Sequence, residues 1–185
     1  MSSHFLDVGS NCGQTFTDYL NKDTKYDGWT VWCFEPSPRH IPALMEEARR
    51  QSSRYTVKVC PFGVYSFTGS ERFFQKDDPM GDSFQPYLAS DHVTENLETG
   101  YELICPVVKL SDFIPRHIPD GEYIELKIDA EGSEYGILYD LLEREKMVDR
   151  IMVEWHQIDP SGKDDRLELI ERYRKIGKEL EPWLL

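Results

Sequence analysis

Acidic side chains and a histidine follow the ends of several short apolar runs in this sequence. Lys127 and Asp129 close one such run, and Glu154 and His156 close another. Because residues two apart in a strand point to the same face, each pair projects from one side of its strand. At the edge where these strand ends meet we expect Asp7, Glu35, Asp129, Glu131, Glu134, Glu154 and His156. Carboxylates gathered around one imidazole can shift each other's pKa values and supply a general base.

Each of these residues also has a plain structural interpretation. Asp129 could cap the following turn, Lys127 could be an ion-pair partner, and Glu134 could simply favour the start of a helix. His156 could be a hydrogen-bonded structural histidine. Asp, Glu and His side chains also suit a metal shell, but nothing in their spacing fixes a ligand count, so we predict no metal.

A glycine-spaced turn follows the first apolar run of the chain. Residues 4–8 predict a strand, Gly9-x-Asn11-x-Gly13 a turn, and residues 14–20 the start of a helix. Glycine allows a tight turn and lets a ligand approach the backbone N–H groups at the helix N-terminus. The dinucleotide fingerprint has a glycine where Asn11 stands, so an ordinary turn without a ligand is the alternative interpretation.

The next apolar run, residues 29–34, ends in Glu35, and Pro36 and Pro38 stop it. This acid comes about 20 residues after the turn, where ribose-binding carboxylates occur in dinucleotide folds. The alternative is a solvated charge at a strand end. Together with the turn, Glu35 predicts a nucleotide-type cofactor site at the carboxyl edge of a doubly wound sheet.

The elements that must position these residues alternate along the chain. Hydrophobic periodicity predicts a helix over 37–52, with Ser37 as its cap, and it predicts inward-facing residues along a last helix near 167–176. The main strands are expected at 4–8, 29–34, 55–60, 123–129 and 150–156. This order implies a parallel sheet with right-handed crossovers.

Residues 62–106 interrupt this alternation as an insertion within a single domain spanning 1–185. Residues 62–67 and 71–75 predict a β-hairpin, and 101–110 a further strand. The long polar loop over 76–100 is expected to be a lid or a substrate-facing segment, or alternatively a surface excursion.

The bulk composition excludes several classes of partner. The 185 residues are 39% hydrophobic and 30% charged, and the formal net charge is −13. Nucleic-acid binding needs clusters of Lys and Arg, which are not visible here. No apolar run approaches a membrane span, and Asp7 and Gly9 interrupt any signal-peptide core. The scattered cysteines suggest neither disulfides nor zinc, which favours a cytoplasmic location.

Three segments together resemble one known family. They are Phe5–Gly13, Phe34–Pro38 and Leu126–Glu134, and the weaker matches are Val108–Phe113 and Gly81–Ser83. These segments are similar to the FkbM family of S-adenosylmethionine-dependent methyltransferases, over a span from about Phe5 to His156. The combination of a G-x-N-x-G turn with a K-I-D-x-E-G-x-E block is the specific part of the match.

The resemblance implies an α/β fold with a Rossmann-like class I methyltransferase sheet, mostly parallel, with helices on both faces. It implies methyl transfer from S-adenosylmethionine, usually to a hydroxyl oxygen of a small molecule or glycan. The cofactor residues by this analogy are Asp7, Gly9, Asn11, Gly13, Glu35, Phe62, Gly63 and Asp129. The candidates for the base are, in order, Glu131, Asp129 and His156.

One departure from the family pattern concerns the C-terminal strands. The chain reaches Leu185 soon after the last predicted helix, so we expect a sheet shortened at that end, with an exposed edge that favours self-association. A non-catalytic cofactor-binding domain, or a fragment of a larger protein, is therefore the alternative. A Rossmann-type oxidoreductase is a third reading, disfavoured by Asn11 and by the acid-rich turn after Asp129.

Overall fold

The computed structural model describes residues 2–76, 81–85, 101–144, 147–156 and 165–183. A six-stranded sheet in the order β3-β2-β1-β7-β8-β9 forms its centre, and every pairing in it is parallel. Its strands are β1 (Ser3–Val8), β2 (Thr30–Phe34), β3 (Thr56–Cys60), β7 (Tyr123–Ile128), β8 (Arg150–Val153) and β9 (Leu180–Pro182). The predicted α/β fold with a mostly parallel sheet is confirmed.

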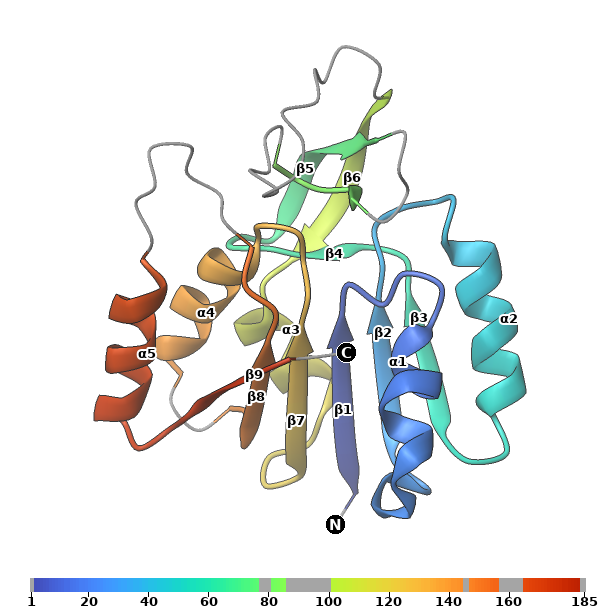
Figure 1. The fold of residues 1–185 in the computed structure, drawn as a ribbon, viewed down its shortest axis with the longest axis horizontal. Coiled ribbons are helices and arrows are strands. Elements are labelled where there is room, and N and C mark those ends of the chain that lie inside the picture. Colours follow the sequence, from blue (N-terminus) through green and yellow to red (C-terminus); the bar gives the residue numbers. More distant parts are fainter. Residues whose placement is uncertain (1, 77–80, 86–100, 145–146, 157–164, 184–185) are drawn as a thin grey trace.

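Helices cover both faces of this sheet (Figure 1). One face packs against α1 (Gln14–Asp18) and α2 (Ile41–Gln51), with short 3-10 turns at Leu20–Lys22 and Thr24–Tyr26. The other face packs against α3 (Leu110–His117), α4 (Glu134–Leu142) and α5 (Arg166–Lys175). In the described part of the chain, no helix has the length and apolar character needed to cross a membrane.

The central strands are buried on both faces because their side chains alternate between two cores. Phe5 of β1 packs with the α1 and α2 side, whereas Leu6 and Val8 pack with the α3, α4 and α5 side. This explains why the strands of the sequence appear as nearly continuous apolar runs. Polar residues within such a strand, such as Asp7 and Lys127, are consequently buried as well.

The insertion builds a second sheet with the order β4-β6-β5, from β4 (Gly63–Val64), β5 (Gly69–Gln75) and β6 (Tyr101–Val108). The predicted hairpin between 62–67 and 71–75 is wrong. β4 pairs in parallel and β5 antiparallel with β6, and the two do not pair with each other. Of the predicted lid, only Lys76 and residues 81–85 lie among the described residues. Figure 1 shows this small sheet standing over the carboxyl ends of the central strands.

The second predicted helix begins later than expected. α2 starts at Ile41, so Ser37 does not cap it. The Ser37 N–H instead donates to a carboxylate oxygen of Glu35 at 2.7 Å, and its hydroxyl donates to Asp82 at 2.8 Å. These contacts hold the residues after β2 in a loop beside the strand ends.

The sheet is less shortened than the sequence suggested, because β9 supplies a sixth strand. Arg150 of β8 fixes its register by donating to both carboxylate oxygens of Glu181, at 2.8 Å and 2.5 Å. Trp183, directly after β9, is buried against Tyr19 with ring centroids 4.8 Å apart. The chain thus adds a sixth strand after α5, at the end where the sequence suggested a shortened sheet.

Candidate functional site

A pocket opens at the carboxyl edge of the large sheet, beside the point where the strand order reverses between β1 and β7. Open α/β sheets bind ligands at this position. The ends of three strands of the large sheet, strands β4 and β5 of the small sheet and the segment at residues 82–84 form its lining. The lining residues are Val8, Gly9, Phe34, Glu35, Pro36, Gly63, Val64, Phe73, Asp82, Ser83, Phe84, Asp129 and Ala130.

Glu35 presents a buried carboxylate on one side of the pocket. One oxygen accepts the N–H of Asn11 at 2.8 Å and the other accepts the N–H of Ser37 at 2.7 Å. Burial raises the pKa of Glu35 to about 7, although these two N–H groups oppose the shift. Each carboxylate oxygen has about two acceptor sites, so each can accept one further donor.

The turn between β1 and α1 keeps none of its own amides for a ligand. The N–H groups of Gly9 and Ser10 both donate to Phe34 O at 3.1 Å. Those of the next three residues donate to Glu35, to the Asn11 side chain and to Ser10 O, respectively. The protein itself thus uses the N–H groups of residues 9–13 that a phosphate cradle would need, and the prediction that a ligand approaches this helix N-terminus stays a prediction.

Gly9 is needed for close packing of the turn against the end of β7. With φ at +77°, a Cβ at this position would lie 1.7 Å from the carbonyl oxygen of Asp129. A side chain at residue 9 would push these two pocket-lining segments apart. The glycine therefore sets the spacing between two strand ends of the site.

Lys127 joins those two segments from within the sheet. Its ammonium lies 3.1 Å from Asp7 and 3.3 Å from Asp129, and it donates to Gly9 O at 2.9 Å. Burial alone would lower the pKa of Lys127, but the charges of Asp7 and Asp129 outweigh it and raise the pKa. The ion-pair interpretation of Lys127 is thus confirmed, and Asp7 reaches the pocket only through this lysine.

His156 lies among carboxylates on the other side of Asp129. Its Nδ1 is 2.8 Å from Oε1 of the fully buried Glu134, and its Nε2 is 3.6 Å from Glu131 and 4.0 Å from Glu154. Burial alone would lower the pKa of His156, but the bond to Glu134 and the surrounding charges raise it to about 9. At neutral pH His156 is therefore a cation that holds this acidic group together.

Glu131 has a raised pKa and an unusual backbone conformation. Burial raises its pKa to about 7, with His156 opposing the shift. Its φ of 47° lies in the left-handed region, which is strained for this residue type. A carboxylate with a pKa near neutrality can gain and lose a proton under ordinary conditions, as a general base must.

Asp129, Glu154 and His156 also offer one ligand atom each within 4.8 Å of one another. Such a set could accept a cation in place of the imidazolium proton. Because the pKa of His156 is raised to about 9, the imidazolium already places one positive charge among these carboxylates at neutral pH. The prediction that the site needs no metal stays a prediction.

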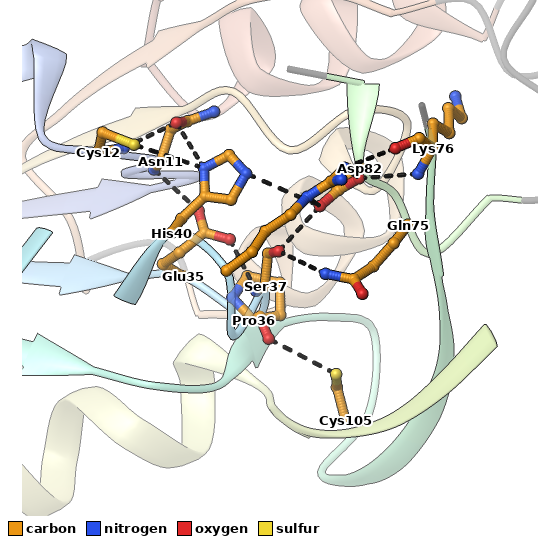
Figure 2. Close-up of polar contacts among 11 residues, drawn as sticks. Asn11, Cys12, Glu35, Pro36, Ser37, His40, Gln75, Lys76, Asp82 and Cys105 are labelled. Carbon is orange, nitrogen blue, oxygen red and sulfur yellow. Dashed lines mark hydrogen bonds and ion pairs between the residues drawn. The ribbon is translucent and has the colours of Figure 1, made fainter. Parts of the chain in front are cut away.

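The pocket brings together only part of the predicted cofactor set. Gly9, Glu35, Gly63 and Asp129 line it. The remaining cofactor predictions, which do not line it, are Asp7, Asn11, Gly13 and Phe62. Asn11 turns its side chain to His40, with Oδ1 and Nδ1 2.6 Å apart (Figure 2), and Phe62 packs on Phe34. The cofactor roles of all eight residues stay predictions.

The sequence analysis expected the loop over 76–100 to face the substrate, but it assigned none of the loop's residues to the site. Asp82, Ser83 and Phe84 come from the polar insertion yet line the pocket opposite the strand ends. Their only signal in the sequence is the short Gly-Asp-Ser run beside an aromatic residue, and no periodicity marks it.

A comparison of the sequence with protein-family models identifies one family. The family profile described as "Methyltransferase FkbM domain" matches residues 7–180. A crystal structure of methyltransferase FkbM from Methylobacillus flagellatus KT is similar with a TM-score of 0.48 and 20% sequence identity. That match covers 77% of this chain and 29% of the solved chain, so the present chain spans less than a third of it. No curated protein matches the sequence.

Proposed function

The chain belongs to the FkbM methyltransferase domain family, and we propose that it transfers a methyl group from S-adenosylmethionine to a hydroxyl oxygen of a small molecule or glycan. The observation that carries the proposal is the buried carboxylate of Glu35, which lines the pocket at the end of β2. Between Glu35 and Asp129 the pocket runs past Gly9, so it spans the strand ends on both sides of β1.

The chemistry of the pocket fits an adenosyl ligand without phosphates. Glu35 uses one acceptor site of each oxygen for a backbone N–H, which leaves two acceptor sites for the two vicinal hydroxyls of a ribose. The amides of residues 9–13 all donate within the protein, so a pyrophosphate would find no donors there. This favours the sulfonium cofactor over a nicotinamide dinucleotide.

The residues that would hold the cofactor follow from this arrangement. Glu35 would accept the ribose hydroxyls, the apolar wall near Gly63 would take the adenine, and Asp129 would border the sulfonium end. The cofactor, when bound, supplies an electrophilic methyl group on a positively charged sulfur. The carboxylate of Asp129 suits that charge, because Lys127 already holds it in one orientation.

The acceptor hydroxyl must lose its proton as its oxygen attacks. Glu131 is our first candidate for the base, since its pKa of about 7 allows it to accept a proton near neutrality. Asp129 is the second. His156 is protonated at that pH, so it would stabilise the ionised form of Glu131, which lies 3.6 Å away, rather than take the proton itself.

Calorimetry with S-adenosylmethionine, S-adenosylhomocysteine and NAD tests the cofactor. We expect both sulfur compounds to bind the wild-type chain and NAD to give no heat. The variant Glu35→Gln should weaken S-adenosylhomocysteine binding by about tenfold, because one acceptor becomes a donor. Binding of NAD alone would overturn the proposal.

Turnover on a panel of hydroxyl compounds, with a labelled methyl donor, separates an enzyme from a binding domain. Glu131→Gln should lower the rate by about a hundredfold or more, while S-adenosylhomocysteine still binds. Binding without transfer to any member of a broad panel of sugars and alcohols would favour the non-catalytic alternative.

A further inference from the structure

The segment Gly81–Gln85 forms a wall of the pocket that is attached to both of its halves. Asp82, Ser83 and Phe84 line the pocket opposite Gly9. Ser83 pairs with Phe74 near the end of β5 through two backbone hydrogen bonds of 2.8 Å and 3.1 Å. The wall segment is therefore fixed to the small sheet, and its side chains face the strand ends of the large one.

Asp82 attaches the wall segment to the Glu35 half of the site. Its carboxylate accepts the Ser37 hydroxyl at 2.8 Å, the Arg39 Nε at 2.8 Å and the Lys76 N–H at 2.9 Å. Arg39 makes a second contact through Nη2, and the Asp82 side chain is only 5% exposed. Figure 2 shows Asp82 between the loop after β2 and the chain at Lys76. Ser37 is also the residue whose N–H holds Glu35.

Ser83 attaches the same segment to the Glu131 half. Its hydroxyl donates to the carbonyl oxygen of Glu131 at 2.5 Å and accepts the N–H of Gln85 at 2.9 Å. Glu131 holds a left-handed backbone conformation, which persists only where its surroundings enforce it. The Ser83 hydroxyl is one such constraint, and it acts on the backbone that aims the Glu131 carboxylate.

Phe84 closes the remaining side. A Cβ added to Gly63 would lie 2.4 Å from the Phe84 ring, so the ring lies directly against the backbone of β4. Within three consecutive residues, the wall segment thus contacts Ser37 beside Glu35, the backbone of Glu131 and the proposed adenine side.

We propose that Asp82 and Ser83 are positioning residues that couple cofactor binding at Glu35 to the placement of Glu131. The proposal rests on the proposed function, because it assumes an adenosyl ligand beside Glu35. When a ligand beside Glu35 restrains the loop at Ser37, the contact with Asp82 restrains the wall segment. The bond from Ser83 to the Glu131 carbonyl oxygen then restrains the Glu131 backbone. Neither residue takes part in the chemistry.

A double-mutant cycle on S-adenosylhomocysteine affinity measures this coupling. Arg39→Gln releases Asp82 from its charged partner, and Ser83→Ala releases Glu131. We expect Arg39→Gln to weaken binding about tenfold, Ser83→Ala about threefold, and the double variant by clearly less than the product. Arg39 is partly exposed, so this variant should fold even where Asp82→Asn does not.

Matched controls lie away from the pocket. Arg54 donates to Asp27 at 2.7 Å and Ser52 donates to Arg49 O at 2.8 Å, which repeat the two kinds of contact that the variants remove. Arg54→Gln and Ser52→Ala should leave the affinity within twofold of wild type. Hydrogen exchange of the peptide spanning 129–134 should quicken in Ser83→Ala and not in Ser52→Ala.

The outcomes separate this inference from the proposed function. Affinity losses that multiply in the double variant, or unchanged exchange over 129–134, would overturn the coupling while leaving cofactor binding intact. Failure of the wild-type chain to bind S-adenosylhomocysteine would overturn both.

Discussion

At the scale of single residues, the site depends on a buried ammonium group. Lys127 contacts Asp7 and Asp129 and donates to the carbonyl oxygens of Val8 and Gly9. Two carboxylates and two carbonyls thus share one positive charge inside the sheet. The ends of β1 and β7 are therefore held in place before any ligand arrives.

Removing the positive charge of Lys127 should destabilise the folded chain. Lys127→Met keeps the length of the side chain but leaves Asp7 buried without a cation, so we expect a loss of about 3–5 kcal/mol in the free energy of unfolding. Lys25→Met is the matched control, because Lys25 is half exposed and lies 3.6 Å from Glu125. It should cost less than about 1 kcal/mol. Urea unfolding followed by circular dichroism measures both, and equal losses would contradict the assigned role.

The carboxyl of Glu35 should make stability depend on pH. Burial raises its pKa from the ordinary 4.5 to about 7, so the folded chain holds this proton more tightly than the unfolded chain. Its contribution to stability is complete below the unfolded pKa and is lost as the pH rises through the folded pKa. Glu35→Gln cannot ionise, so its stability relative to wild type should rise by about 2–3 kcal/mol between about pH 5 and about pH 8.

Urea unfolding of the wild-type chain and of Glu35→Gln across that pH range measures this difference. Every other ionisable group is common to the two proteins. The pH dependence of the difference between their unfolding free energies therefore isolates the titration of Glu35. Two stability curves that stay parallel would show that Glu35 titrates alike in the folded and unfolded chains.

At the scale of elements, the last strand is an integral part of the sheet. β9 pairs with β8, and Trp183 directly after it is 4% exposed in the core beneath α1. Trp183→Ala should therefore cost about 3–5 kcal/mol of unfolding free energy. Leu167→Ala, at a side chain that is 68% exposed on α5, should change it by less than about 0.5 kcal/mol. A Trp183 variant as stable as wild type would mean that this end of the chain does not pack as described.

The sequence predicted the central elements well because their signals are local. The strands at β1, β2, β3, β7 and β8 are apolar runs with acids or turn residues at their ends, and the parallel order follows from the helices between them. β9 has only three residues, and its register depends on the ion pair between Arg150 and Glu181, which no local pattern reveals.

Nonlocal contacts explain the other errors. The partner of β5 is β6, far along the chain, so the nearest apolar run was chosen wrongly. At the site, Glu35 and Asp129 were found because strand ends can be located from sequence. Asp82 lay in a segment expected to face the substrate but was not assigned to the site, because its contacts with Ser37 and Arg39 are distant in sequence.

At the scale of the whole molecule, the pocket lies at the carboxyl edge of the large sheet, where the strand order reverses between β1 and β7. The small sheet stands above this edge (Figure 1). A ligand bound there contacts both halves of the large sheet and the wall segment at once. Such a ligand should stabilise the fold as a whole, since it binds the folded chain alone.

Thermal unfolding should report this binding. At a concentration about 100 times its dissociation constant, S-adenosylhomocysteine should add about 2.7 kcal/mol, which raises the midpoint by roughly 5–10 °C. NAD at the same concentration should leave the midpoint unchanged. A rise of similar size in the unfolding midpoint with NAD would favour the oxidoreductase interpretation instead.

The backbone N–H groups of residues 9–13, which all donate within the protein, should affect how the pocket discriminates between adenine compounds. ATP and its relatives share the base and the sugar of the proposed cofactor, so ribose recognition by Glu35 alone cannot discriminate against them. Their phosphate tails, however, would have to give up water for a turn whose every N–H is already satisfied. The pocket would thus disfavour the commonest nucleotides of a cell because the turn offers their phosphates no hydrogen-bond donors. No group of repelling charges would be needed.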